Sequence, residues 1–327
     1  MRIVLIRTDR IGDLILSTPA IATVRASFPQ AHLTMICSPY NRVVMERNTD
    51  VDEIVTLSRE KPGVFGARFR GADLAIALAP RNTDLAIAAG TRARVRAGYT
   101  YLRRYVARLT ARLYVNRLMI SEADPDLSER DPHRHVRHEV NQLLDLVALA
   151  GARERVDRLR LNITDEDRAG SAYLPENPVV LHLGLRWFAE GSTLDSTLQL
   201  MKQLRRFGVP LVVTYAPECE QFVKPIAESR LADVLLGGLP FYRWAAVLER
   251  ACVVVTVDTG ATHVASAVRR PTVVAFEHRY FRLNSQEWAP YGVPHVLVQK
   301  PGDESAASLE RFRGEILQGV AQLIEHA

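Results

Sequence analysis

Long hydrophobic runs, cysteine and lysine are all scarce in this sequence of 327 residues. No apolar stretch reaches the ~20 residues that a helix needs to cross a bilayer. The apolar segment within Met1–Arg7 is too short for a secretory signal and is predicted to be the first strand. The three cysteines (Cys37, Cys219 and Cys252) lack metal-ligand spacing, so we expect reduced, mostly structural thiols. These absences predict a cytoplasmic protein without a transmembrane helix.

The chain is too long for one compact core and suits two domains of roughly 150 residues each. Strand-like and helix-like segments alternate throughout, which predicts a parallel α/β architecture. A long helix over His135–Ala150 ends the first series, and Ala306–His326 ends the second. The polar stretch Asn162–Asn177 is the expected linker. Two such halves facing each other would form a cleft, and open α/β sheets bind ligands at the carboxyl ends of their strands.

The periodicity predicts five strands in each half. The expected strands are Arg2–Ile6, Leu33–Cys37, Val51–Val55, Asp73–Leu78 and Arg94–Gly98, and then Val179–Leu183, Pro210–Thr214, Asp233–Leu236, Cys252–Val257 and Thr272–Phe276.

Acidic residues are missing between Asp84 and Glu122, where arginine and tyrosine alternate. Arginine pairs bidentately with phosphate, and tyrosine suits a partly apolar, partly wet boundary. The patch fits anionic lipid or a phosphorylated glycolipid, and a solvated helix face explains it equally well. No nucleic-acid-binding module is visible, so we expect no nucleic-acid partner. The residues are Arg92, Arg94, Arg96, Tyr99, Tyr101, Arg103, Arg104, Tyr105, Arg108, Arg112, Tyr114 and Arg117.

The loop after the first strand, Arg7–Asp13, lacks the Gly-x-Gly-x-x-Gly pattern of dinucleotide folds, which disfavours a nicotinamide enzyme. Asp13 directly follows Gly12 and precedes a predicted helix. One interpretation is an acidic residue favoured by the helix dipole. The other is a general base that accepts a proton from an attacking hydroxyl group.

A second loop, Asp258-Thr259-Gly260, follows the apolar run Cys252–Thr256 and opens another predicted helix. Free backbone N–H groups and the positive helix end form a phosphate site there, which would fit the nucleotide of an activated sugar. Plain N-capping by Asp258 and Thr259 is the alternative interpretation, and a core histidine is an equal alternative for His263. Together, the strand, Asp-Thr-Gly and the histidine five residues after the aspartate are more specific than each alone.

Several motifs together resemble glycosyltransferase family 9, the bacterial heptosyltransferases of lipopolysaccharide core assembly. The resemblance extends over nearly the whole chain, and its strongest part is the Asp-Thr-Gly-x-x-His segment. The motifs are Ile6–Asp13 with Leu16–Ala20, Arg94–Tyr99, His138–Val140, Asp258–His263 with Pro271–Val273, and Pro290–Gly292.

This resemblance implies a GT-B fold, with two Rossmann-like domains that face each other across a cleft. Residues 1–165 would form the acceptor-binding domain and 170–303 the nucleotide-sugar-binding domain, with 304–327 a helix that can cross back to the first domain. The reaction implied is an inverting, metal-independent transfer of a sugar, with ADP-heptose the expected donor, onto a lipopolysaccharide-core or related glycan. No further cofactor is expected.

The resemblance also implies roles for individual residues. Asp13 is the expected general base, and acceptor binding is assigned to Arg10, Gly12, Arg103 and Arg104. The expected donor-binding residues are Asp258, Thr259, Gly260, His263, Arg186, Glu218 and Glu220.

Three positions depart from the family pattern. Leu185 replaces a lysine that reaches the donor phosphates, and Arg186 is the available substitute. Cys219 occupies the place of a carboxylate, with Glu218 and Glu220 on either side. Glu277-His278-Arg279 replaces the usual residues after a late strand. These departures allow a different donor or an inactive relative.

Two other functions therefore remain open: a different GT-B nucleotide-sugar enzyme, such as an epimerase, and a catalytically silent sugar- or lipid-binding protein. A screen of nucleotide-sugars distinguishes another GT-B enzyme from a heptosyltransferase. A silent relative would bind a ligand but release no nucleoside diphosphate with any donor. A metal hydrolase is disfavoured, because His133, His135 and His138 lack a carboxylate-bearing metal motif. We expect a cytoplasmic protein, and the arginine-rich patch allows peripheral contact with the anionic inner face of the cell membrane.

Overall fold

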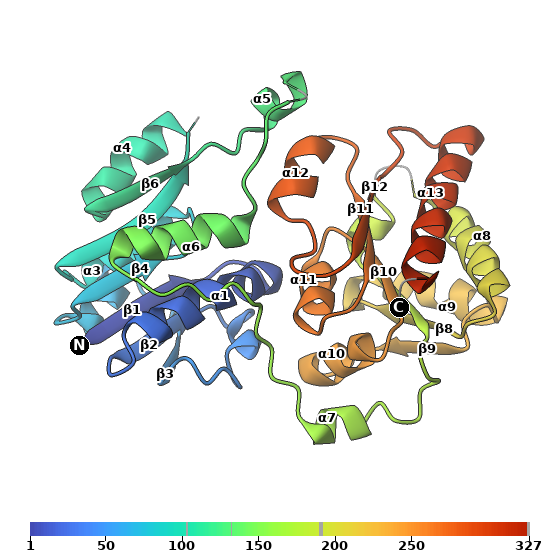
Figure 1. Cartoon of the computed structure of the whole chain (residues 1–327), viewed down its shortest axis with the longest axis horizontal. Helices are drawn as coiled ribbons and strands as arrows, with labels where there is room; N and C mark the ends of the chain where they lie inside the picture. Colours follow the sequence, from blue (N-terminus) through green and yellow to red (C-terminus); the bar gives the residue numbers. More distant parts are fainter. Residues whose placement is uncertain (103, 132, 190–191, 326–327) are drawn as a thin grey trace. The chain divides into compact units, whose positions relative to one another are not determined.

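The computed structural model describes residues 1–327 with the exception of 103, 132, 190–191 and 326–327 (Figure 1). The chain divides into two compact units, Met1–Asn162 and Ile163–Ala327. Each unit contains a six-stranded sheet in which every described pairing is parallel. The expected α/β class with two Rossmann-like sheets is confirmed.

The sheet of the first unit has the order β3-β2-β1-β4-β5-β6. Its central strands β1 and β4 are almost wholly buried, which explains their continuous apolar sequences, since a parallel strand is covered on both faces. The strands are β1 (Arg2–Arg7), β2 (His32–Cys37), β3 (Glu53–Thr56), β4 (Leu74–Ala77), β5 (Val95–Tyr101) and β6 (Arg117–Ser121).

The helices of the first unit follow the strands as crossovers. The first helix packs against the last, and the last ends at Gly151, whose φ of 112° is readily adopted by glycine. These helices are α1 (Ile11–Ser27), α2 (Pro62–Gly66), α3 (Asn82–Gly90), α4 (Tyr105–Tyr114), α5 (Pro125–Arg130) and α6 (Glu139–Ala150), with 3-10 turns at Arg42–Val44 and Ala67–Phe69.

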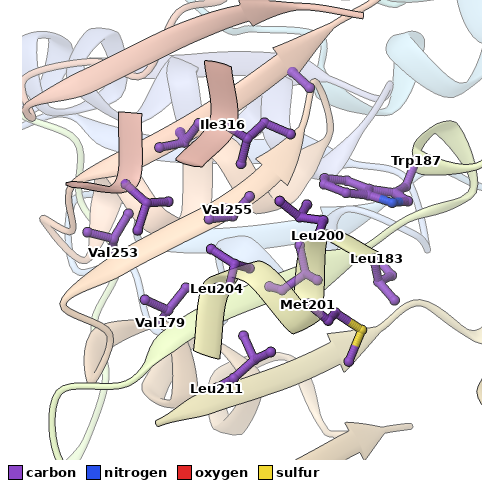
Figure 2. Close-up of a cluster of buried hydrophobic side chains, with 14 of the residues drawn as sticks. Val179, Leu183, Trp187, Leu200, Met201, Leu204, Leu211, Val253, Val255 and Ile316 are labelled. Atoms are coloured by element: carbon purple, nitrogen blue, oxygen red, sulfur yellow. The ribbon is translucent and has the colours of Figure 1, made fainter. Parts of the chain in front are cut away.

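The sheet of the second unit has the order β12-β11-β10-β7-β8-β9. Counted from its first strand, this is the same doubly wound order as in the first unit. Buried side chains from these strands meet Leu200, Met201 and Ile316 of two covering helices in one hydrophobic core (Figure 2). The strands are β7 (Val179–Leu183), β8 (Leu211–Tyr215), β9 (Val234–Gly237), β10 (Val253–Val257), β11 (Thr272–Phe276) and β12 (His295–Gln299).

The helices of the second unit are α7 (Asp165–Ala169), α8 (Leu194–Leu204), α9 (Glu220–Ser229), α10 (Phe241–Glu249), α11 (Gly260–Ala267), α12 (Phe281–Glu287) and α13 (Ala306–Glu325), with 3-10 turns at Leu185–Trp187, Arg205–Phe207 and Pro217–Cys219. Helix α13 packs on α8 and on β10, β11 and β12 of its own unit. The expected crossing of residues 304–327 to the first unit stays a prediction.

The structure adds to or differs from the expected elements at three places. The helix expected from His135 begins only at Glu139, because the extended His138 is its N-cap and accepts a hydrogen bond from the Val140 N–H group (3.1 Å). The expected linker contains the short helix α7. A capping box starts this helix: the Thr164 side chain accepts a hydrogen bond from the Asp167 N–H group, and the Asp167 side chain accepts one from the Thr164 N–H group. Each sheet also has a sixth strand, β6 or β12, that the sequence pattern did not predict.

In the part of the chain that the structure describes, no helix combines the length and the apolar character needed to cross a membrane.

Candidate active site

The two sheets reverse their strand order between β1 and β4 and between β7 and β10. Ligands of open α/β sheets bind at such switch points, beyond the carboxyl ends of the strands. The loop after β1 leads into the first turn of α1, which carries Asp13, and the loop after β10 carries Asp258 and Thr259 before α11 begins at Gly260. Both predicted loops therefore lie where this fold places its ligands, one in each unit.

Arg7, the last residue of β1, organises the site of the first unit. Its side chain is 1% exposed, and Nε donates a hydrogen bond to Asp9 Oδ1 (2.9 Å) while Nη2 donates to Asp13 Oδ1 (3.1 Å). Nη1 donates to the Leu78 carbonyl at the end of β4, across the switch point. One guanidinium group thus fixes both carboxylates of the loop relative to the sheet.

Glu139, the first residue of α6, is the third carboxylate held by Arg7. Its Oε1 accepts hydrogen bonds from Arg7 Nη1 (3.0 Å) and from the Tyr99 hydroxyl (2.7 Å). Burial raises the pKa of Tyr99 well above its ordinary value, so this hydroxyl keeps its proton and remains a donor. Two neutral or cationic donors on Glu139 stabilise the packing of α6 over the loop.

Asp13 remains partly accessible, with its side chain 23% exposed. Desolvation by burial raises its pKa to about 6; the negative charges of Asp9 and Glu139 act in the same direction, and Arg7 and Arg10 oppose them. A carboxylate with a pKa near neutral is well matched to take up a proton. Asp13 also lies in the first turn of α1, so the helix-dipole interpretation holds beside this one.

The acceptor residues predicted from the sequence lie in different places. Gly12 is buried in the first turn of α1, and Arg10 is the exposed N-cap residue before it, so both adjoin Asp13. Arg104 precedes α4, and its guanidinium carbon lies 5.0 Å from the centre of the Tyr101 ring. Arg103 lies outside the described residues.

Asp84, in the first turn of α3, binds the loop after β1 through Thr8 and was not predicted as a site residue. Its carboxylate accepts hydrogen bonds from the Thr8 N–H group (2.9 Å) and from the Thr8 hydroxyl (3.0 Å). The side chain is fully buried, and this burial raises its pKa to about 6. A polar residue just beyond the end of a buried strand was the available signal in the sequence.

In the second unit, Arg186 connects the ends of three neighbouring strands. It lies in the turn Leu185–Trp187 after β7, and Nη1 donates to Asp258 Oδ2 (2.9 Å) and to the Asp258 carbonyl (3.1 Å). Its Nε lies 3.6 Å from Glu277 Oε1 beyond β11. The structure therefore brings Arg186, the available substitute for the lysine that Leu185 replaces, together with Glu277 of another departure at the Asp258 loop.

The N-terminus of α11 makes no hydrogen bond with the side chain of its N-cap residue. Thr259 is the N-cap residue, yet its side chain makes no capping hydrogen bond and donates instead to the Val257 carbonyl (3.3 Å). Plain N-capping by Thr259 is therefore not what the structure shows. A Cβ atom at Gly184 would lie 3.4 Å from the Thr259 side chain, in ordinary van der Waals contact with this loop. His263 is buried inside α11.

The loop after β8 carries the two alternative carboxylates. Cys219 is buried, and Glu218 and Glu220 on either side are exposed. Burial, together with the charge and a hydrogen bond of Glu220, raises the pKa of Tyr215. Both glutamates are therefore accessible to a ligand from solvent. They also lie near the loop after β7, because β8 adjoins β7 in the sheet.

Lys300, the residue after β12, is a positioning residue that the sequence analysis missed. It is 1% exposed, and its ammonium group donates to the carbonyls of Arg186 (2.7 Å), Trp187 (3.4 Å) and Ala189. This cation therefore fixes the turn that carries Arg186. The signal available in the sequence was the rarity of lysine, since the chain has only four.

Within the residues that the structure describes, no group of three or more histidine, cysteine or acidic side chains is arranged to hold a metal ion. The site chemistry that is present consists of carboxylates, arginine and backbone N–H groups. Such a set can remove a proton in the first unit and bind an anion in the second.

Comparison with known proteins identifies related sequences and folds. The model of Glycosyltransferase family 9 (heptosyltransferase) matches residues 198–311. Lipopolysaccharide heptosyltransferase 3 of Escherichia coli is 21% identical over 291 residues, which cover 83% of this chain and 82% of that protein.

Two solved structures share the fold over essentially the whole chain. A glycosyl transferase family 9 protein from Veillonella parvula has a TM-score of 0.78 at 18% identity, covering 100% of this chain and 97% of that one. The ADP-heptose lipopolysaccharide heptosyltransferase II of Escherichia coli has a TM-score of 0.75 at 18% identity, with 100% of both chains covered. The fold is GT-B.

Proposed function

Because this chain is a glycosyltransferase that carries a family 9 domain over residues 198–311, we propose that it transfers a heptose from ADP-heptose to a lipopolysaccharide-core or related glycan. The proposed reaction inverts the anomeric configuration and uses no metal ion. The names of the two Escherichia coli relatives support the heptose and the acceptor class, and one of them names ADP-heptose.

One observation carries the proposal: Asp13 is a partly accessible carboxylate whose pKa is raised to about 6 at a ligand-binding edge of the sheet. In the proposed step, Asp13 takes the proton of an acceptor hydroxyl as that oxygen attacks the anomeric carbon. The bond from this carbon to the diphosphate oxygen breaks, and the nucleoside diphosphate leaves with the electron pair. Arg7 keeps Asp13 oriented through the hydrogen bond of 3.1 Å.

The second unit supplies the groups that would stabilise the leaving diphosphate. The first N–H groups of α11 and the positive end of that helix favour an anion. Arg186 adds a full positive charge at the same loop, and preorganised donors of this kind are typically worth several kcal/mol in the transition state. Together these groups would neutralise the charge that develops on the leaving diphosphate, which is the role that a divalent cation fills in other enzymes.

Glu277 is a competitor of the donor diphosphate for Arg186. Its carboxylate lies beside Arg186, so in the free enzyme the arginine shares its charge between Glu277 and Asp258. A diphosphate would compete with both carboxylates for this guanidinium. The exposed Glu218 and Glu220 are the proposed partners of the ribose hydroxyls, since carboxylates accept hydrogen bonds from such groups.

The test is a calorimetric comparison of ADP, UDP and GDP, followed by transfer assays with ADP-heptose in the presence of EDTA. We expect ADP to bind most tightly, ADP to be released only with acceptor present, and the product to have the opposite anomeric configuration by NMR. Preference for UDP or GDP would reject the donor. Loss of activity in EDTA that is restored by a divalent cation would reject metal independence.

A further inference from the structure

Helix α4 (Tyr105–Tyr114) exposes an unusual amount of apolar side chain. Ten large hydrophobic residues are exposed among those described, and four of them belong to this ten-residue helix. Tyr105, Val106, Leu109 and Leu113, called here the α4 apolar stripe, are between 67% and 81% exposed. Concentrated exposure of this kind usually marks an interaction site.

The positions of these residues place them on one side of the helix. At about 100° per residue, the four side chains fall within roughly 100° of arc. The opposite side carries Ala111, which is buried, and α4 packs against α3 and β5 in its own unit. Towards its own unit the helix buries Ala111 and packs the half-buried Tyr114 on the core, while the four residues of the stripe point away from that side.

Arginines flank the stripe along one edge. Arg104, Arg108 and Arg112 recur every four residues, so their side chains form a row beside the stripe. Arg108 lies 5.8 Å from the centre of the Tyr105 ring, which keeps its charge next to the apolar surface. The sequence has no acidic residue from 85 to 121 to neutralise this row.

We propose that α4 docks the enzyme on an anionic phospholipid bilayer, with the stripe inserted among the acyl chains and the arginine row on the headgroup phosphates. An interfacial helix of this kind combines an apolar face with a cationic one. Charge argues against a second copy of this chain, because two arginine rows would be brought together. The docking goes beyond the proposed function, since it needs neither donor nor turnover.

The test is flotation of the full-length protein with vesicles of phosphatidylglycerol and phosphatidylcholine, compared with vesicles of phosphatidylcholine alone. We expect binding to the anionic vesicles that weakens as salt is raised. The double variant Leu109→Ser/Leu113→Ser should lower the partition coefficient at least about tenfold, because two leucines no longer enter the apolar layer. Arg112→Gln should lower it by about fivefold.

The matched control is Val64→Ser/Leu149→Ser, which removes two exposed apolar side chains from other helices of the same unit. Its partition coefficient should stay within about twofold of the wild type, given that scattered exposed residues carry little binding. The Leu109 and Leu113 residues lie outside the proposed catalytic groups, so transfer to a water-soluble acceptor should continue in the double variant.

A second measurement does not depend on loss of binding. In Leu113→Trp, the added indole should be quenched by lipids with brominated acyl chains only when anionic vesicles are present. Wild-type protein that does not float, a double variant that floats as well as wild type, or an unquenched Leu113→Trp would each overturn the proposal. The proposal would also be overturned if sedimentation velocity showed a dimer for the wild type and a monomer for the double variant, and the wild type did not bind vesicles. The stripe would then be a contact between two copies of the chain.

Discussion

A single buried guanidinium, that of Arg7, determines what Asp13 can do. Burial alone would make Asp13 a neutral acid, and a fully solvated carboxylate would be too weak a base. Arg7 opposes the burial and holds the pKa of Asp13 at about 6 while it fixes the carboxylate in place. At the residue scale, the pKa of Asp13 is therefore set by a balance between desolvation and the charges around it, among which Arg7 is the largest.

Replacing Asp13 by asparagine should abolish the proton transfer and leave donor binding intact. We expect kcat to fall by about 10²-fold or more, with the ADP dissociation constant within about twofold of wild type. In the wild type, kcat should rise with pH through about 6, because the base acts only when it has lost its proton. Retained turnover in Asp13→Asn would reject the assignment of the base.

Asp84 gives a stability prediction with a definite sign. Its folded pKa of about 6 exceeds the ordinary 3.8, so the folded state holds the proton more tightly. The stabilisation is complete below about pH 3.8 and is lost as pH rises through about 6. A pKa difference of this size between the folded and unfolded states changes the free energy of unfolding by about 3 kcal/mol.

Asp84→Asn removes this titration and can still accept the hydrogen bond of the Thr8 N–H group. Between about pH 4 and pH 8, the free energy of unfolding of Asp84→Asn should therefore gain about 3 kcal/mol relative to wild type. Urea unfolding at several pH values measures the difference. The exposed Asp157→Asn is the control, and an equal drift in both variants would contradict the explanation.

At the scale of elements, the turn after β7 is held in place by hydrogen bonds of two buried residues, Lys300 and Trp187. Lys300 binds its carbonyls from β12, and the buried Trp187 donates from Nε1 to Thr197 Oγ1 on α8 (2.9 Å). Arg186 therefore projects from a fixed turn. Preorganisation of this kind lowers the cost of binding, since few side chains have to be ordered.

Glu277→Gln should tighten ADP binding about threefold or more, because Arg186 then loses a competing carboxylate and the site loses a negative charge. Arg186→Gln should weaken it by about tenfold, as a charge-assisted hydrogen bond is removed. Isothermal titration calorimetry measures both. Glu304→Gln, an exposed change in the same unit, is the control. Weaker ADP binding in Glu277→Gln would show that this carboxylate itself contacts the nucleotide.

The two strands missed by the sequence analysis occupy the same kind of place in their sheets. Strands β6 and β12 lie at sheet edges and are mostly half-buried, so neither shows the continuous apolar run of β7 or β10. Central strands are covered on both faces and are predictable for that reason. Edge position alone does not hide a strand, since β3 and β9 form the other two edges, are also half-buried and were predicted.

At the scale of the whole molecule, the two units should respond differently to nucleotide. Each has its own buried core, so two unfolding transitions are expected on heating. ADP at about 100 times its dissociation constant should stabilise only the second unit, by about 2.7 kcal/mol. For a unit of this size, its midpoint should rise by roughly 5–10 °C. Differential scanning calorimetry measures this, and equal shifts of both transitions would contradict it.

The sequence by itself determined the parallel α/β class, the central strands, and the two loops at which Asp13 and Asp258–Gly260 lie. These features are local, because a buried strand must be apolar and the polar residues that follow it must stand at the sheet edge. Only the tertiary structure decided the partners of those residues. Leu78, Asp84, Tyr99 and Glu139 gather around the β1 loop from four different elements, and Glu277 and Lys300 reach Arg186 or its turn from two more. Electrostatic interactions act between residues close in space, and closeness in space is set by the order of the strands.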